Sequence, residues 1–146
     1  MDIKHFQDNG KLRLLIIVGT RPEIIRLAAV INKCRKYFDV LLAHTGQNYD
    51  YNLNGVFFKD LKLADPEIYM EAVGEDLGAT MGNIIDKSFK VMVETKPDAI
   101  LVLGDTNSCL SVIGAKRLHI WRPEIAVRMN VYRKKQIVES WILSLM

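Results

Sequence analysis

Short, continuous apolar runs and longer segments with helical spacing follow one another along the chain. Residues 12–19, LRLLIIVG, form an apolar run that ends at a glycine, which is typical of a strand buried on both faces of a sheet. Pro22 follows, and apolar residues then recur at helical spacing, so we expect a helix over 22–36. A second apolar run predicts a strand over 39–44 that leads into a glycine turn.

The alternation of predicted strands and helices continues to residue 120. Residues 49–61 predict a short helical segment, 76–98 a long helix that Pro97 ends, 98–108 a strand followed by polar capping residues, and 108–118 another helix. We expect the long helix to bury one stripe of residues: Leu77, Met81, Ile84, Ile85, Ser88 and Met92. Strands that alternate with helices predict right-handed βαβ crossovers and an α/β fold class with a Rossmann-like parallel sheet.

Composition fits a single folded domain. The chain has 146 residues, of which 49% are hydrophobic and 25% charged, as in ordinary globular domains. It contains no run of 18 apolar residues, and MDIKHFQDNGK at its start lacks an apolar signal core. We therefore expect a cytoplasmic protein without a membrane span. Cys34 and Cys109 fall in predicted helices at a spacing that suits no metal site, which favours buried free thiols.

The positive net charge comes entirely from residues 121–146, which we call the tail. The tail contains five basic and two acidic residues and so accounts for the whole net charge of +3. Residues 1–120 are therefore neutral overall, which argues against a nucleic-acid-binding surface on them.

Three polar turns are expected at the carboxyl edge of the sheet, where open parallel sheets bind ligands. They are GTRPE at 19–23, HTGQNYD at 44–50 and GDTNS at 104–108. The first and the third lead from a glycine into a helix N-terminus, whose free N–H groups favour phosphate. Arg21 adds a forked donor suited to phosphate, and Asp105 is placed to act as an acid or base or to bind a hydroxyl.

Each of these turns also has a purely structural interpretation. Thr20 could simply cap a helix whose dipole Glu23 favours, and Asp105 with Thr106 could likewise be only a helix cap. His44, at a strand end, is of a kind that is more often a hydrogen-bonded structural residue than a catalyst. The sequence contains neither a G-x-G-x-x-G turn nor a Walker loop, so NAD and ATP are not favoured, and no metal site is predicted.

In combination, three segments resemble the N-terminal half of the non-hydrolysing UDP-N-acetylglucosamine 2-epimerase family. The segments are VGTRPEIIRLAAVI, HTGQNYDYNLNGVFF and KPDAILVLGDTNSCLSVIGAKR, in family order and at matching separations. The resemblance covers about residues 11–120. HTGQNYDYNLN is particularly similar to the branch that acts on UDP-linked acetamido-deoxy sugars, such as the UDP-N-acetylfucosamine synthases.

The resemblance implies two Rossmann-like halves with a UDP-sugar between them, as in GT-B glycosyltransferases. It implies inversion at C2 through elimination and re-addition of UDP, which needs proton transfer and stabilisation of the departing pyrophosphate. Carried over, Arg21 would face the diphosphate, Gln47 would line the sugar pocket, and Asp105 would be a catalytic carboxylate. Four further residues would belong to the substrate site: Thr20, His44, Thr106, and Arg26 where many relatives have lysine. The family suggests a homodimer and implies no dissociable cofactor, nucleic acid or membrane.

The tail departs from the family pattern. Relatives continue with segments like HMEAGNR and PEETNRRIVD. Permitted codons for WRPEI and VYRKKQIVESWI, regrouped one base earlier, yield MEAGN and LPEETNRRIVD. We therefore interpret the chain as a 1–10 N-terminal extension, an incomplete 11–120 domain and an aberrant, frameshifted tail at 121–146. The alternative is a basic amphipathic helix that binds a partner or a membrane surface.

These expectations have functional consequences. A chain with this tail would lack further acid/base residues, so we expect little or no epimerase activity from it alone and an exposed apolar sheet edge. Two other functions stay open: a degenerate nucleotide- or partner-binding domain without catalysis, and half of a GT-B glycosyltransferase. The sequence does not identify the UDP-hexosamine.

Overall fold

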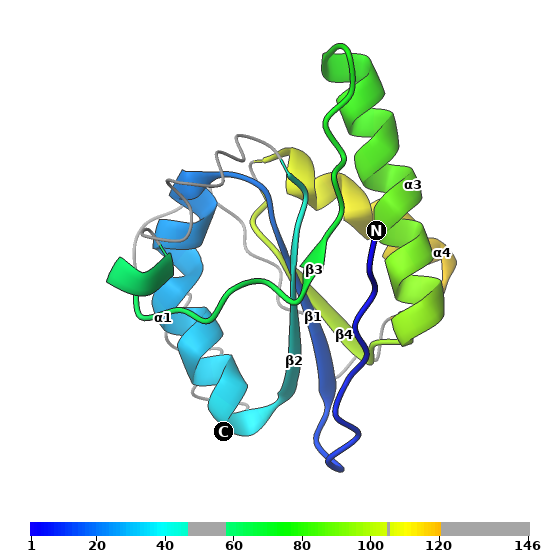
Figure 1. The fold of residues 1–146 in the computed structure, drawn as a ribbon. Helices are drawn as coiled ribbons and strands as arrows, with labels where there is room; N and C mark the ends of the chain where they lie inside the picture. The colour runs from blue at the N-terminus through cyan, green and yellow to red at the C-terminus, as the bar shows by residue number, and fades with distance from the viewer. Residues whose placement is uncertain (47–57, 105, 121–146) are drawn as a thin grey trace.

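The chain folds around one four-stranded parallel sheet. The computed structural model describes residues 1–46, 58–104 and 106–120. The strands are β1 (Arg13–Val18), β2 (Asp39–His44), β3 (Ile68–Tyr69) and β4 (Ala99–Val102), in the spatial order β3-β2-β1-β4. The helices are α1 (Arg21–Tyr37), α3 (Leu77–Thr95) and α4 (Ser111–Arg117), with the 3-10 turn η1 (Asn107–Leu110) ahead of α4. Figure 1 shows α1 on one side of the sheet and α3 with α4 on the other.

β1 is the centre of the apolar core. Its burial rises from half-buried Arg13 to five consecutive buried residues, as expected for a strand paired on both edges. In the register of the sheet, Ile16 pairs with Leu42 of β2 and with Leu101 of β4. These three side chains belong to the apolar layer that α1 covers. Residues one position away in β1 belong to the opposite layer, under α3 and α4.

Residues 1–10 lie against the same face of the sheet as α3. Phe6 is buried and belongs to the apolar layer beneath α3. The N–H of Asp8 donates to Oδ2 of Asp39 at 2.9 Å, which ties the segment to the start of β2. The predicted N-terminal extension therefore contributes to the core.

The predicted order of strands and helices is confirmed within the described ranges. β2 has its predicted bounds, and β1 and α1 differ from theirs by one residue at each end. β3 was not predicted, because a strand of two residues carries no periodicity. The predicted helix over 108–118 begins as the 3-10 turn η1. Residues 58–60 of the predicted segment 49–61 are helical, and residues 49–57 lie outside the described part.

The predicted buried stripe of α3 is only partly correct. Three of its six residues are buried: Ile84, Ser88 and Met92. Met81 and Ile85 are half-buried, whereas Leu77 is 64% exposed. Leu77 lies in the first turn of α3, and Figure 1 shows that this end of the helix projects beyond the strands. Periodicity identifies the apolar side of a helix, but not where the helix overhangs its sheet.

Asp76 caps the N-terminus of α3 from the protein surface. Its Oδ1 accepts the N–H of Ala79 at 2.7 Å. Asp76→Ala should lower the free energy of unfolding by about 1 kcal/mol, because this helix N–H loses its acceptor. Asp76→Asn keeps an oxygen in the same place and should lose less. Urea denaturation of the two variants measures the difference, and equal losses would contradict the cap.

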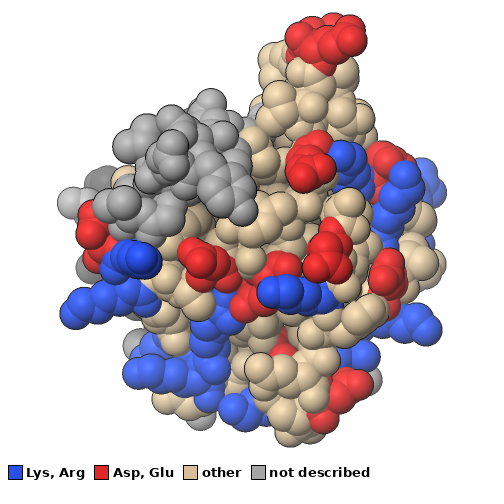
Figure 2. Space-filling model, in the orientation of Figure 1, with Lys and Arg blue, Asp and Glu red and all other residues tan. Residues whose placement is uncertain are grey.

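Charged groups of both signs lie side by side over most of the face in Figure 2. This mixture agrees with the neutral overall charge of residues 1–120. Of the helices in the described ranges, none combines the length and the apolar character needed to cross a bilayer.

Candidate functional site

The turn after β1 leads directly into α1 at the carboxyl edge of the sheet. Thr20 is the N-cap of α1, Arg21 is its first residue, and Pro22 lies in the first turn. The first N–H groups of a helix have no partner within the helix and carry partial positive charge. Because Val18 is the last residue of β1, the N-terminus of α1 lies at the edge where the sequence predicts ligand binding, although Pro22 contributes no N–H there.

Glu23 joins this turn to the turn after β4. The residue is fully buried, with an exposed fraction of 0%. Its Oε2 accepts the N–H groups of Gly19 and Thr20 at 2.8 and 2.6 Å. Its Oε1 accepts the hydroxyl of Thr106 at 2.6 Å, from a residue 83 positions further along the chain. One carboxylate therefore holds together two of the three predicted turns.

Only part of this role was accessible from the sequence. The spacing T-x-x-E at 20–23 is that of a capping box, and the bond from the Thr20 N–H to Glu23 is half of such a box. From the sequence, Glu23 was expected only to interact favourably with the helix dipole. The bond to Thr106 depends on β4 lying beside β1, which no local pattern shows.

His44 ends β2 and is 1% exposed. Its Nδ1 accepts the N–H of Gly46 at 2.9 Å, so the neutral ring carries its proton on Nε2. Burial lowers the pKa of His44 from 6.5 to about 4, although the charge of Glu23 acts in the opposite direction. The imidazole is therefore neutral at pH 7. This hydrogen bond and the neutral charge support the structural interpretation of His44.

Buried polar atoms without a partner mark the same edge. Within the described residues, three such atoms lie on the predicted turns: Arg21 Nε, Thr45 Oγ1 and Ser108 Oγ. A fourth, Arg35 Nε, lies near the end of α1. Buried polar groups are normally hydrogen-bonded, so the unpaired atoms on these three neighbouring turns are hydrogen-bonding groups that a bound ligand could satisfy.

The remaining predicted site residues divide into two groups. Arg26 is exposed and lies beyond the first turn of α1. Thr106 is half-buried, and its bond to Glu23 places it beside Thr20. Gln47 and Asp105, the predicted sugar-pocket residue and the predicted catalytic carboxylate, lie outside the described residues.

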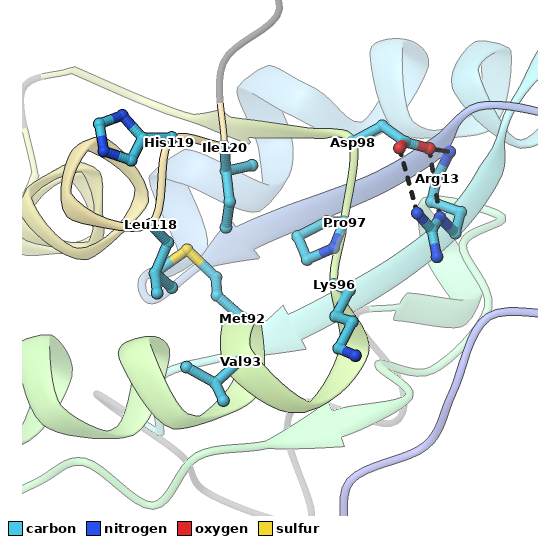
Figure 3. A pocket seen from close by; sticks show the side chains of 9 residues that line it. All are labelled: Arg13, Met92, Val93, Lys96, Pro97, Asp98, Leu118, His119 and Ile120. Atoms are coloured by element: carbon cyan, nitrogen blue, oxygen red, sulfur yellow. Dashed lines mark hydrogen bonds and ion pairs between the residues drawn. The ribbon is translucent and has the colours of Figure 1, made fainter.

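A cavity of about 410 Å³ lies at the other end of the sheet, as Figure 3 shows. Arg13 and Asp98 line it, at the amino ends of β1 and β4, together with Lys96 and His119. Asp98 accepts the Arg13 backbone N–H at 2.9 Å and two guanidinium N–H groups at 3.2 Å each. The Arg13–Asp98 pair thus ties two strand ends together, which argues for a structural role of this cavity wall.

Within the described ranges, neither the two cysteines nor a cluster of acidic residues forms a metal site. No group of three or more His, Cys, Asp or Glu residues there is placed to hold a metal ion. Cys34 and Cys109 are both free, and Cys34 is buried as predicted, whereas Cys109 is half-buried. Burial raises the pKa of the Cys34 thiol, which disfavours its reactive thiolate.

Sequence comparison gives a consistent set of relatives. Residues 32–121 match the family model described as UDP-N-acetylglucosamine 2-epimerase. The UDP-N-acetylglucosamine 2-epimerase of Methanococcus maripaludis is 34% identical over 128 residues, which is 86% of this chain and 34% of the relative. The chain spans about a third of the length of the curated relatives that it matches.

Solved structures agree with the sequence relatives. UDP-N-acetylglucosamine 2-epimerase from Rickettsia bellii is 46% identical, with a TM-score of 0.69 over 75% of this chain and 29% of that structure. The Methanocaldococcus jannaschii UDP-GlcNAc 2-epimerase, in complex with UDP-GlcNAc and UDP, is 35% identical, with a TM-score of 0.69 over 75% of this chain and 31% of that structure. The predicted fold class, a Rossmann-like parallel sheet from a GT-B-like architecture, is confirmed.

Proposed function

The chain belongs to the UDP-N-acetylglucosamine 2-epimerase family, and from this premise we propose that its three carboxyl-edge turns bind the UDP part of a UDP-N-acetylhexosamine. One observation carries the proposal: three unpaired buried polar atoms lie on the turns that sequence motifs single out. The M. jannaschii relative holds UDP-GlcNAc and UDP, which is the ligand class expected here. An arginine at the N-terminus of a helix suits a diphosphate.

We further infer that the whole protein inverts C2 of the sugar without hydrolysing the nucleotide sugar. A base removes the proton from C2 while the bond between C1 and UDP breaks, which leaves a glycal and free UDP. Re-addition of UDP to C1, with a proton delivered to the other face of C2, gives the epimer. Asp105 would take part in proton transfer, and Gln47 would line the sugar pocket. Arg21 would stabilise the charge on the departing pyrophosphate.

UDP binding tests the proposal on the chain itself. Isothermal titration calorimetry should detect binding of UDP to the chain. Arg21→Ala should lower the affinity for UDP about 10- to 100-fold, because a charged hydrogen-bond donor to phosphate is lost. Arg21→Lys keeps the positive charge but loses the forked guanidinium, so its affinity for UDP should lie between those of the wild type and Arg21→Ala. Lys33→Ala removes an exposed cation from the same helix about three turns away and is the matched control.

The results of that titration distinguish the alternatives. Failure of the wild-type chain to bind UDP at millimolar concentration would contradict the proposal, as would equal effects of Arg21→Ala and Lys33→Ala. Binding without turnover of UDP-GlcNAc agrees with our expectation of little or no activity from this chain alone. Family membership sets aside the glycosyltransferase alternative. Homodimer formation and a cytoplasmic location stay predictions.

The tail lies outside the described residues, so its interpretation as an out-of-frame translation also stays a prediction. The nucleotide sequence around the codon of Ile120 tests it directly. Codons other than those that regroup into MEAGN and LPEETNRRIVD would contradict it, and an intact later frame would support it.

A further inference from the structure

We propose that Glu23 is a positioning residue whose carboxylate locks the turn of Arg21 against the turn of Thr106. The lock itself rests on contacts of this chain, and its effect on UDP rests on the proposed function. Both oxygens are engaged: Oε2 accepts Gly19 and Thr20 N–H groups, and Oε1 accepts the Thr106 hydroxyl. A ligand that touches both turns would then meet them at a fixed separation.

Burial makes these contacts persistent. Glu23 is 0% exposed, so water does not compete for its oxygens. A buried carboxylate is costly unless its oxygens are satisfied, and here three donors satisfy them. Helix capping alone does not need such burial, because Asp76 caps α3 with an exposed hydrogen bond.

The Thr106 contact has an alternative within its own turn. Oγ1 of Thr106 lies 3.1 Å from the Leu103 carbonyl oxygen and 2.6 Å from Glu23 Oε1. A hydroxyl donates only one proton, and the shorter contact is the one to Glu23. The hydroxyl therefore donates to Glu23, and this bond holds the turn after β4 to α1.

Two substitutions of Glu23 distinguish the effect of its side-chain length from the effect of its charge. Glu23→Gln keeps the length of the side chain: its oxygen can accept the two backbone N–H groups, and its amide can donate to Thr106, which then donates to Leu103. Glu23→Asp keeps the charge but is shorter by one methylene, so it cannot span both turns. A positioning role predicts that Gln retains function better than Asp, and a role of the charge alone predicts the reverse.

Amide hydrogen exchange, followed by NMR, tests the lock without any ligand. Thr106→Val removes the hydroxyl and should speed exchange at Gly19 and Thr20 about tenfold, because the carboxylate loses its anchor on the other turn. Thr106→Ser keeps the hydroxyl and should stay close to wild type. Ser111→Ala removes a buried bond to the Ser108 carbonyl in the same region and is the control for general destabilisation.

UDP titration tests the functional consequence. We expect Glu23→Asp and Thr106→Val each to lower the affinity for UDP about tenfold. The affinity of Glu23→Gln should stay within about threefold of that of the wild type. Glu23→Asp combined with Thr106→Val should be no weaker than Glu23→Asp alone, because both break the same link. Urea midpoints of the same variants separate lost stability from lost affinity, and Ser111→Ala should change the midpoint alone.

Three results would overturn the inference: unchanged exchange at Gly19 and Thr20 in Thr106→Val, equal acceleration in Ser111→Ala, or Glu23→Asp binding UDP better than Glu23→Gln. A wild-type chain that does not bind UDP contradicts the proposed function instead. The exchange measurement then still decides whether Glu23 locks the two turns.

Discussion

Acidification from pH 6.5 to pH 4 should remove about 3 kcal/mol of folding free energy through His44 alone. Burial lowers the pKa of this histidine from 6.5 to about 4, so the folded state keeps it neutral over that range. The unfolded state binds a proton there and the folded state does not. Stability therefore falls as the pH decreases through the window, and this contribution is fully present only about one pH unit or more above 6.5.

A variant isolates this contribution. His44→Asn places an amide oxygen where Nδ1 accepts the Gly46 N–H, and it has no proton to bind in this range. The difference in unfolding free energy between wild type and variant should shrink by about 3 kcal/mol between pH 7 and pH 4. Urea denaturation at several pH values measures it, since effects of all other groups are shared.

His119→Asn is the matched control, because it removes an exposed histidine. If His44→Asn and the wild type lose stability in parallel as the pH falls, His44 is not held neutral, and the electrostatic account of the carboxyl edge is wrong.

The fold was predictable because its signals are local. Five consecutive buried residues in β1 follow from one apolar run, and the bounds of β2 follow from another. Pro22 and the spacing of apolar residues place the start of α1 within one residue. β3 had no such signal, because its parallel pairing of Ile68 with Ala43 exists only in the assembled sheet.

The candidate site was predictable as positions but not as contacts. The turns of Arg21, His44 and Thr106 were singled out by residue type and by the rule for open parallel sheets. Glu23 was missed as a link, because its partners combine one local turn with a hydroxyl from another strand end. The burial of Glu23 between two turns depends on the order of the strands in the sheet, which cannot be predicted from the polarity of one residue.

Substitution of Ile16 by alanine should cause the largest loss of stability in the core. Ile16 is 0% exposed in the central strand and lies in one row with Leu42 and Leu101 under α1. Removing its outer carbons leaves a cavity enclosed by two strands and a helix, and should cost about 2–5 kcal/mol, against about 0.5–1.5 for Ile16→Val. Since small domains have only about 5–15 kcal/mol of stability, Ile16→Ala should unfold at much lower urea. Ile25→Ala, on the exposed side of α1 at 54% exposure, is the matched control and should stay within about 0.5 kcal/mol of wild type. Equal losses at the two isoleucines would contradict β1 as the centre on which the carboxyl-edge turns are built.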